Sequence, residues 1–253
     1  MKKTILLVAI FVATLVACGN AHTQITLTLQ PKESEEGKVE IFLRGTGTAK
    51  IDWGDGSPIQ THELMVLNRK IDGFWIRYWQ YHPLFSHTYA NKNDTYTITV
   101  IGENITLLIC SDIGLIHLDV TDNPALIYLD CSNNQLTNLN VRRNTSMTHL
   151  NCSNNQLTNL DVNYNSLLLE LNCENNQLKS LDLSYNTELR TLHPEYNQLS
   201  AAALNSLLET LNSNEADDGK FIYIRRSSIG DSETDISISE QKRWNSWVIE
   251  DLE

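Results

Sequence analysis

The sequence is short of positive charge. Of its 253 residues, 19 are Lys or Arg and 31 are Asp or Glu, so the formal net charge is −12. Nucleic-acid phosphates and anionic lipid headgroups bind proteins that present a basic surface, and an acidic chain is repelled by both. The composition therefore argues against a protein that binds DNA, RNA or an anionic membrane surface.

Long apolar runs and enzyme motifs are missing as well. A membrane-spanning helix needs about 18 or more apolar residues in a row, and no such run occurs. The chain has no Gly-x-Ser-x-Gly, no His-Glu-x-x-His, no phosphate-binding glycine loop and no cysteine beside a plausible catalytic histidine. We expect a protein that is not an enzyme, with no catalytic residue, no cofactor and no metal.

The N-terminus has the pattern of a secretory signal. Lys2 and Lys3 precede an apolar stretch that reaches Ala17, and the stretch ends in Leu-Val-Ala-Cys18-Gly19. A positive region followed by a short apolar region is typical of a segment that is removed after secretion. We therefore exclude residues 1–17 from the folded domains.

The end of this stretch resembles the lipobox of bacterial lipoproteins. The resemblance implies cleavage before Cys18, acylation of Cys18 and a lipidated linker over residues 18–23. Several acyl chains on one cysteine anchor a protein firmly, so the membrane contact is expected through this anchor only. Gly19 in place of Asp implies sorting to the outer membrane. An ordinary secretion signal with a chance cysteine is the alternative.

Residues 24–104 alternate apolar and polar side chains, as half-buried antiparallel strands do. Trp53-Gly54-Asp55-Gly56-Ser57 has the composition of a tight hairpin turn, because Asp-Gly accepts positive φ angles. The segments 52–57, 87–89 and 96–100 resemble the PKD-type immunoglobulin-like domain, which implies a β-sandwich. The apolar members of the alternation are Ile25, Leu27, Leu29, Val39, Ile41, Leu43, Ala49, Ile51, Trp53, Tyr96, Ile98 and Val100.

An insertion over residues 59–85 interrupts this resemblance. Tryptophan and tyrosine bury a large area and keep a polar group, so an aromatic cluster can stack on a sugar or anchor a partner. Packing on an open face of the sandwich, or on the joint to the next domain, is the alternative. The aromatic side chains of the insertion are Phe74, Trp75, Tyr78, Trp79, Tyr81 and Phe85.

From residue 105 to residue 199 the sequence repeats every 21 residues. The unit Leu-x-x-Leu-x-Cys-x-x-Asn-x-Leu begins at Leu126 and recurs from Met147 and Leu168, with weaker copies before and after. This resembles the short bacterial subclass of leucine-rich repeats, which implies a solenoid of about five units. One unit cannot bury its leucines alone, whereas stacked units share a continuous core.

The same period assigns the cysteines and asparagines. Cys110, Cys131, Cys152 and Cys173 occupy one core position and are expected to be buried thiols, with a disulfide between neighbours or a zinc site as alternatives. Asparagine can satisfy backbone groups at turns and tolerates left-handed backbone conformations. Two rows of it are expected to form such turns: Asn134, Asn155, Asn176 and Asn197, and Asn123, Asn144, Asn165 and Asn186.

The residues beside the inward leucines are expected on the concave surface of the solenoid. Their side chains are polar and mildly acidic, and we predict that they bind an unknown protein partner, such as a host-surface protein. A solvated sheet without a partner is one alternative, and a glycan bound by the aromatic insertion is the other. The predicted binding residues are Tyr128, Asp130, His149, Asn151, Glu170, Asn172, Glu174, His193 and Glu195.

Residues 200–253 are expected to cap the solenoid. Residues 201–211 have helical spacing, residues 221–225 alternate as a strand does, and residues 237–244 suggest a second short helix. Trp244 and Trp247 are assigned to the core of this cap. The sequence thus predicts a mainly β fold: an immunoglobulin-like β-sandwich, a short leucine-rich-repeat solenoid and a mixed α/β C-terminal cap, carried by a lipid-anchored envelope protein.

Overall fold

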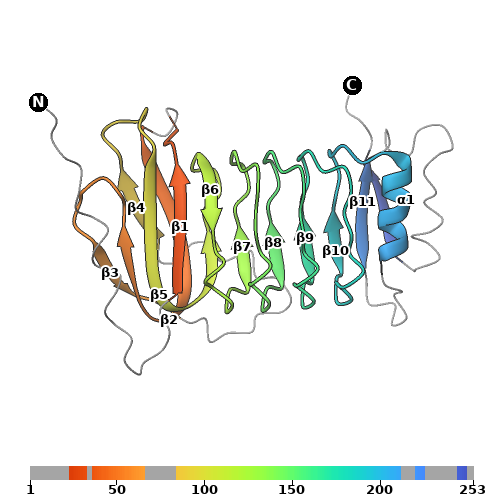
Figure 1. The fold of residues 1–253 in the computed structure, drawn as a ribbon, viewed down its shortest axis with the longest axis horizontal. Coiled ribbons are helices and arrows are strands. Elements are labelled where there is room, and N and C mark those ends of the chain that lie inside the picture. The colour runs from red at the N-terminus through yellow and green to blue at the C-terminus, as the bar shows by residue number, and fades with distance from the viewer. Residues whose placement is uncertain (1–22, 33–35, 66–83, 212–219, 226–243, 250–253) are drawn as a thin grey trace, which may run out of the picture.

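The computed structural model describes residues 23–32, 36–65, 84–211, 220–225 and 244–249. These residues form a mainly β fold in which one 12-stranded sheet runs along the long axis, with a single described helix at its C-terminal end (Figure 1). The elements are β1 Thr23–Leu29, β2 Lys38–Asp52, β3 Gln60–Glu63, β4 Leu84–Thr88, β5 Tyr96–Ile109, β6 Leu115–Asp119, β7 Tyr128–Asp130, β8 His149–Asn151, β9 Glu170–Asn172, β10 Thr191–His193, α1 Ala201–Thr210, β11 Phe221–Arg225 and β12 Asn245–Ile249.

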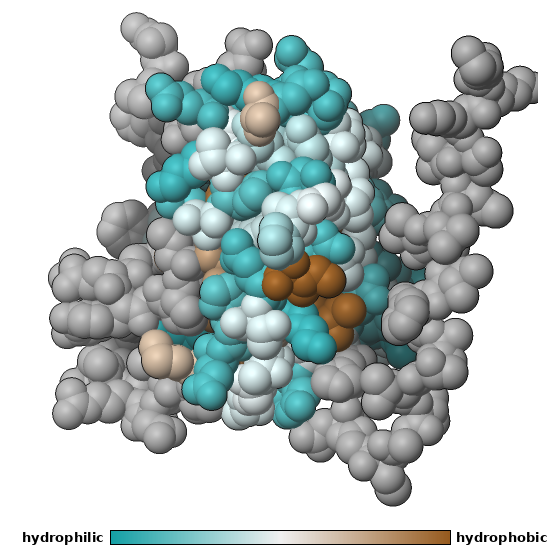
Figure 2. Space-filling view, turned by 90° about the vertical axis from the view of Figure 1, so that its left-hand side faces the viewer, coloured by the Kyte–Doolittle hydropathy of each residue, from teal (hydrophilic) through white to brown (hydrophobic). Residues whose placement is uncertain are grey.

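The N-terminal strands pair antiparallel, β1 with β5, and β2 with β3, β4 and β5. The predicted alternation is confirmed, because the apolar members of β1, β2 and β5 point into one core while their neighbours, apart from Arg44 and Gly45 at the β2 bulge, stay at least partly exposed. Tyr96 is only half-buried and packs against that core. At this end of the molecule the described surface is hydrophilic or neutral apart from a small hydrophobic spot (Figure 2).

The alternating apolar residues of 39–43 and 49–51 all lie on β2, which is a single long strand. Its pairing with β5 shifts register at Arg44/Gly45 and again between Thr46 and Ala49. A bulge lets one strand bend without ending. Gly45 permits it, since a Cβ there would lie 1.9 Å from the Asn104 carbonyl oxygen, and Gly47 contributes a φ of 76°.

The turn after β2 is also longer than the tight hairpin expected. Residues 53–59 connect β2 to β3, and the positive φ angles belong to Gly54 and Gly56, not to Asp55. Asp52 and Asp55 instead accept backbone hydrogen bonds through Oδ1, from the Gly54 amide at 2.9 Å and the Ser57 amide at 3.0 Å. The aspartates therefore stabilise the loop as hydrogen-bond acceptors.

The N-terminal strands and the repeats share a continuous sheet. β5 runs through residue 104, where one domain was expected to end, and then pairs in parallel with β7. β6, from the first repeat, pairs antiparallel with β1. The Asn123 side chain donates to the Gln24 carbonyl at 2.8 Å, and the Gln30 amide donates to the Gly114 carbonyl at 3.1 Å. A strand and several hydrogen bonds thus join the two parts directly.

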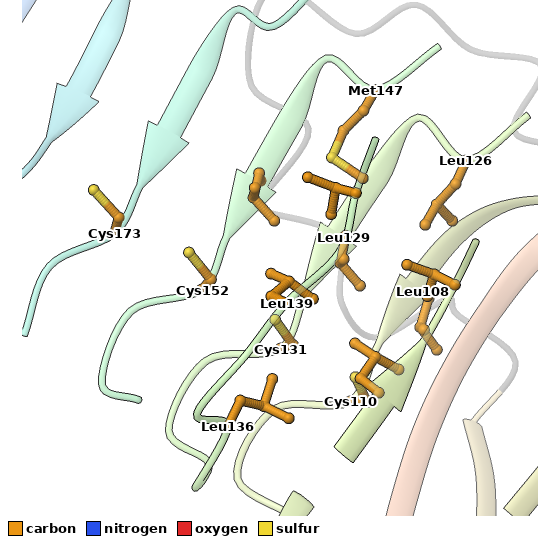
Figure 3. Close-up of a cluster of buried hydrophobic side chains, with 14 of the residues drawn as sticks. Leu108, Cys110, Leu126, Leu129, Cys131, Leu136, Leu139, Met147, Cys152 and Cys173 are labelled. Atoms are coloured by element: carbon orange, nitrogen blue, oxygen red, sulfur yellow. The ribbon is translucent and has the colours of Figure 1, made fainter. Parts of the chain in front are cut away.

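The repeats form a β-solenoid of about four turns. β7, β8, β9 and β10 pair in parallel, with each residue opposite the one 21 positions later. The middle leucine of each strand is buried, and after β7, β8 and β9 the cysteine two residues later points into the same interior (Figure 3), whereas Pro194 takes this position after β10. Cys110, Cys131, Cys152 and Cys173 are all buried and free, which confirms that they are core thiols.

The inner asparagine row joins each turn to its neighbours. Asn155 accepts a hydrogen bond from the Leu136 amide at 2.9 Å and donates to the carbonyls of Cys131 and Cys152 at 3.0 and 3.1 Å. The left-handed conformation expected of this row belongs instead to the residue before it. The positive-φ residues of these turns are Asp112, Asn133, Asn154, Asn175 and Tyr196.

The outer asparagine row closes the opposite turns. Asn144 donates through Nδ2 to the Val120 and Asn123 carbonyls, both at 2.8 Å, and Asn165 makes the equivalent pair of bonds one turn later. These asparagines are buried, yet the Oδ1 atom of each lacks a hydrogen-bond partner. The outer row therefore uses only half of the hydrogen-bonding capacity of its amides.

The C-terminal segment extends the sheet as well as ending it. α1 begins after Ser200, whose hydroxyl accepts a hydrogen bond from the Ala203 amide at 3.2 Å, and it buries Leu204, Leu207 and Leu208. β11 then pairs in parallel with β10, and β12 with β11. The expected helix and strand are confirmed, and Trp244 is buried as expected of a cap residue.

Several predicted features lie outside the described residues. They are the signal over residues 1–17, the acylated Cys18, the aromatic residues Phe74, Trp75, Tyr78, Trp79 and Tyr81, and nearly all of the helix expected over residues 237–244. The side chain of Trp247 is likewise not described. Among the helices of the described ranges, none has the length and apolarity needed to cross a bilayer.

Candidate binding surface

The predicted binding residues occupy one face of the sheet from β7 to β10, which we call the strand face. They come from positions on either side of the inward leucines, so the 21-residue register aligns them in rows across the turns. The rows are Tyr128, His149, Glu170 and Thr191; Asp130, Asn151, Asn172 and His193; and Ser132, Ser153, Glu174 and Glu195.

The first row begins with two stacked rings. The rings of Tyr128 and His149 lie 5.8 Å apart at 28°, and both side chains are largely buried. Burial lowers the pKa of His149, with the nearby Glu170 carboxylate acting in the opposite direction, and burial raises the pKa of Tyr128. Both groups are therefore uncharged near pH 7 and present a flat, neutral surface.

The second and third rows are linked to each other in the β7 and β8 turns. Asp130 accepts hydrogen bonds from the Ser132 hydroxyl at 2.7 Å and amide at 3.0 Å. Asn151 accepts the same pair from Ser153, at 2.8 and 3.2 Å. Asp130, Ser132 and Ser153 are buried. Asp130 was predicted to bind a partner, and both of these hydrogen bonds go to its Oδ1 atom.

The C-terminal end of the strand face is more acidic. Glu174 and Glu195 replace the serines of the preceding turns, and His193 lies 3.1 Å from Glu195, between Nδ1 and Oε1. The pKa of Glu174 is raised by burial and then by the Glu195 carboxylate. The ring of Tyr223 stacks on His193 at a centroid distance of 4.0 Å and an angle of 12°.

Tyr223 was not among the predicted binding residues. The sequence does predict the strand that carries it, from the alternation around Ile222. What it does not indicate is the pairing of that strand with β10, because the segment between them does not keep the 21-residue period. The parallel pairing brings Tyr223 beside His193 and lengthens the strand face by one strand.

The structure offers no metal-binding cluster on this face or elsewhere in the described ranges, where no three histidine, cysteine, aspartate or glutamate residues are grouped suitably. The four core thiols are held neutral, since burial raises the pKa of each cysteine well above its ordinary value. Their Sγ atoms contact carbonyls of the next turn, as from Cys152 to Asn172 at 3.5 Å. These cysteines therefore act as packing residues.

A second polar cluster lies in the N-terminal part. The His87 Nε2 atom is 2.7 Å from the Asp55 Oδ2 atom, the His87 ring stacks on Trp53, and the Tyr89 hydroxyl donates to the Trp53 carbonyl at 2.7 Å. Donors on Ser57, followed by His87, lower the pKa of Asp55 to about 2. These contacts of Asp55, His87 and Tyr89 tie residues 53–57 to the strand region 87–89, so we assign the cluster a structural role.

The comparisons with known proteins give structural similarity only. No protein-family model and no curated protein matches the sequence. Among solved structures, the functional domain of InlJ from Listeria monocytogenes, described as including a cysteine ladder, is 28% identical with a TM-score of 0.43, over 56% of this chain and 29% of that one. An internalin, InlF, from Listeria monocytogenes strain 4b F2365 is 21% identical with a TM-score of 0.36, over 46% and 35%. The chain thus spans about a third or less of these neighbours.

Proposed function

We propose that this chain is a non-enzymatic, lipid-anchored protein of the bacterial cell envelope whose strand face binds a protein partner. The observation that supports it best is the register of β7 to β10, which holds half-buried aromatic and polar side chains in fixed rows. Tyr128, His149 and Glu170 stand side by side in the first row. A surface that is rigid before binding loses little conformational entropy when a partner docks.

The N-terminal strands are proposed to be a PKD-type immunoglobulin-like domain that carries this surface away from the membrane. Support comes from the antiparallel pairing of β1 to β5 and from the turn that holds Asp52 and Asp55. Because β5 passes directly into the solenoid, the orientation of the strand face relative to this domain is fixed.

The test of partner binding uses the purified full chain, immobilised and exposed to proteins released from cell surfaces. Tyr128→Ala and Glu170→Lys are expected to abolish retention of the partner, while Glu188→Lys, which reverses an exposed charge on an outer turn, leaves it intact. A protein that is retained equally well by Tyr128→Ala, Glu170→Lys and Glu188→Lys does not bind the strand face. If every retained protein gives this result, the proposal is wrong.

The lipid anchor is tested separately, because it rests on the sequence around Cys18 alone. Cells that express the chain are labelled with radioactive palmitate, and Cys18→Ser is expected to remove the label and release the protein from membranes. Protease treatment of intact cells then distinguishes an outward-facing from a periplasmic location. Equal labelling of the two forms would refute acylation at this residue.

Glycan binding is the second candidate function, favoured by the concentration of aromatic residues over 74–85. Stacking on sugar rings needs exposed tryptophan or tyrosine faces. Binding to a glycan array that disappears with Trp75→Ala and Trp79→Ala, and persists with Tyr128→Ala, would favour it over protein binding.

A further inference from the structure

The third row of the strand face breaks its own pattern at two consecutive turns. In the β7 and β8 turns this position holds Ser132 and Ser153, whose hydroxyls donate to the residue two positions earlier. In the β9 and β10 turns it holds Glu174 and Glu195. A carboxylate can only accept hydrogen bonds, so the side-chain bond of the earlier turns is lost, while the Glu174 amide still donates to the Asn172 Oδ1 atom at 3.1 Å. Departures from a local rule tend to mark functional positions.

Glu195 carries an oxygen atom without a partner. Its side chain is only 3% exposed, and its Oε1 atom faces His193 Nδ1 at 3.1 Å. The Oε2 atom is buried and has no hydrogen bond. Burying a carboxylate without full compensation is costly, so this oxygen favours any added donor or cation.

Glu174 adds a second carboxylate on the adjacent turn. Within the described part of the chain, no hydrogen bond or ion pair reaches its carboxylate, and burial together with Glu195 disfavours its charged form. His193 contacts Glu195 directly, and its effect on Glu174 is electrostatic and smaller than that of burial. A positive charge placed between the two carboxylates would relieve both the burial and the mutual repulsion.

An aromatic ring borders the same position. Tyr223 stacks on His193, whose Nδ1 atom in turn faces the Glu195 carboxylate. Ring faces and carboxylates together favour lysine and arginine side chains, because both attract positive charge. The three rows of the strand face on β7 to β10 contain four acidic residues and no lysine or arginine. β11 ends with a basic residue, Arg225.

We propose that Glu174, His193, Glu195 and Tyr223 form a subsite for a lysine or arginine side chain of a protein partner. This inference rests on the proposed function and adds the chemistry of the partner: a basic segment lies along the strand face and inserts one cation at its C-terminal end. The acidic net charge of the chain, −12, favours the approach of such a segment.

The experiment measures binding of a fluorescent oligolysine peptide to the full chain by anisotropy, at about 0.15 M ionic strength to screen distant charges. The same peptide with acetylated lysines is the neutral control. We expect oligolysine to bind and the acetylated peptide not to bind. Glu174→Gln is expected to weaken binding about tenfold, because a hydrogen bond to a charged group is lost. Tyr223→Leu is expected to weaken it as well.

Glu188→Gln is the matched control, since it removes one exposed acidic charge away from the subsite and should change affinity less than about twofold. Equal weakening by Glu174→Gln and Glu188→Gln would mean diffuse attraction and would overturn the proposal. Absence of oligolysine binding would also overturn it. Binding that appears only in Arg225→Gln would show that the chain supplies the cation itself, which again overturns it.

Failure of this proposal is distinguishable from failure of the proposed function. A protein partner whose retention is lost with Tyr128→Ala but unchanged with Glu174→Gln would leave the strand face as the binding surface and remove only the cationic subsite. Thermal unfolding and far-ultraviolet circular dichroism of each variant check that it is folded. If Glu174→Gln does not fold, Glu195→Gln and Tyr223→Leu answer the same question.

Discussion

Individual side chains in the solenoid differ in how much hydrogen bonding they provide, even where the sequence repeats. Asn155 of the inner row makes bonds with both its oxygen and its nitrogen. Asn165 of the outer row donates twice, but its Oδ1 atom has no partner. Both side chains are buried. Two residues of the same type, on opposite sides of the solenoid, therefore have different stabilising roles.

We expect Asn155→Ala to destabilise the protein more than Asn165→Ala. The first substitution leaves the Leu136 amide without its acceptor, whereas the carbonyls that lose a bond in either variant each keep another donor. An unpaired buried group costs about 1–3 kcal/mol, so the difference in the free energy of unfolding is expected to be about 2 kcal/mol. Urea denaturation measures it. A larger loss for Asn165→Ala would contradict the hydrogen-bond assignment of the two rows.

Asp55 gives the N-terminal part a defined pH dependence. Donors on Ser57 and His87 lower its pKa from 3.8 to about 2. A carboxyl group with a lowered folded-state pKa stabilises the fold above its ordinary pKa and loses that contribution as the pH falls toward the lowered value. Asp55→Asn should therefore lower the thermal midpoint at neutral pH, and this difference should shrink between about pH 4 and about pH 2.

The control for this measurement is Asp94→Asn, which changes an exposed aspartate of a turn. Its thermal midpoint is expected to follow that of the unmodified chain over the whole pH range. A difference for Asp55→Asn that stays constant down to pH 2 would show that the carboxylate charge is not what stabilises the loop.

At the scale of single elements, the bulge in β2 is a feature that the alternation of apolar and polar residues does not predict. β2 changes register twice against β5, and it does so where glycine leaves room for the facing backbone. The buried positions of β2 follow the period-2 pattern, so the sequence indicates them correctly. The bulge itself is not indicated, because alternation resumes on the same face after it. A periodic pattern likewise does not predict which strands pair with each other.

The bulge makes Gly45 sensitive to substitution. A Cβ at this position would lie 1.9 Å from the Asn104 carbonyl oxygen and 2.8 Å from its carbon, so the backbone of β2 or β5 must move. We expect Gly45→Ala to lower the free energy of unfolding by roughly 3 kcal/mol. Gly56→Ala is the comparison: nothing lies within 4 Å of its Cβ, and only its φ of 85° opposes alanine, at about 1 kcal/mol. Equal losses would contradict the close contact.

At the scale of the whole molecule, the sequence predicts the N-terminal strands and the repeats better than it predicts the strand pairing that joins them. The 21-residue period places the leucines, the thiols and the strand-face rows, because each repeated position meets the same neighbours in every turn. The junction depends on pairings between segments far apart in the chain, such as β1 with β6, which no local pattern encodes. For the same reason Tyr223 was missed, whereas His193 and Glu195 were predicted. The structure therefore adds the pairings by which the two parts share one continuous sheet.

Because the sheet is continuous, we expect a substitution that destabilises the N-terminal core to destabilise the solenoid as well. Leu27 is fully buried on β1, between β5 and β6, and both of those strands also belong to the solenoid side of the junction. Leu27→Ala is expected to cost about 2–5 kcal/mol. Hydrogen exchange monitored by mass spectrometry should then become faster in β7 and β8 as well as in β1. The exposed Ile59→Ala serves as the control and should change neither region. Faster exchange confined to β1 would mean that the two parts unfold independently, because coupled units lose protection together.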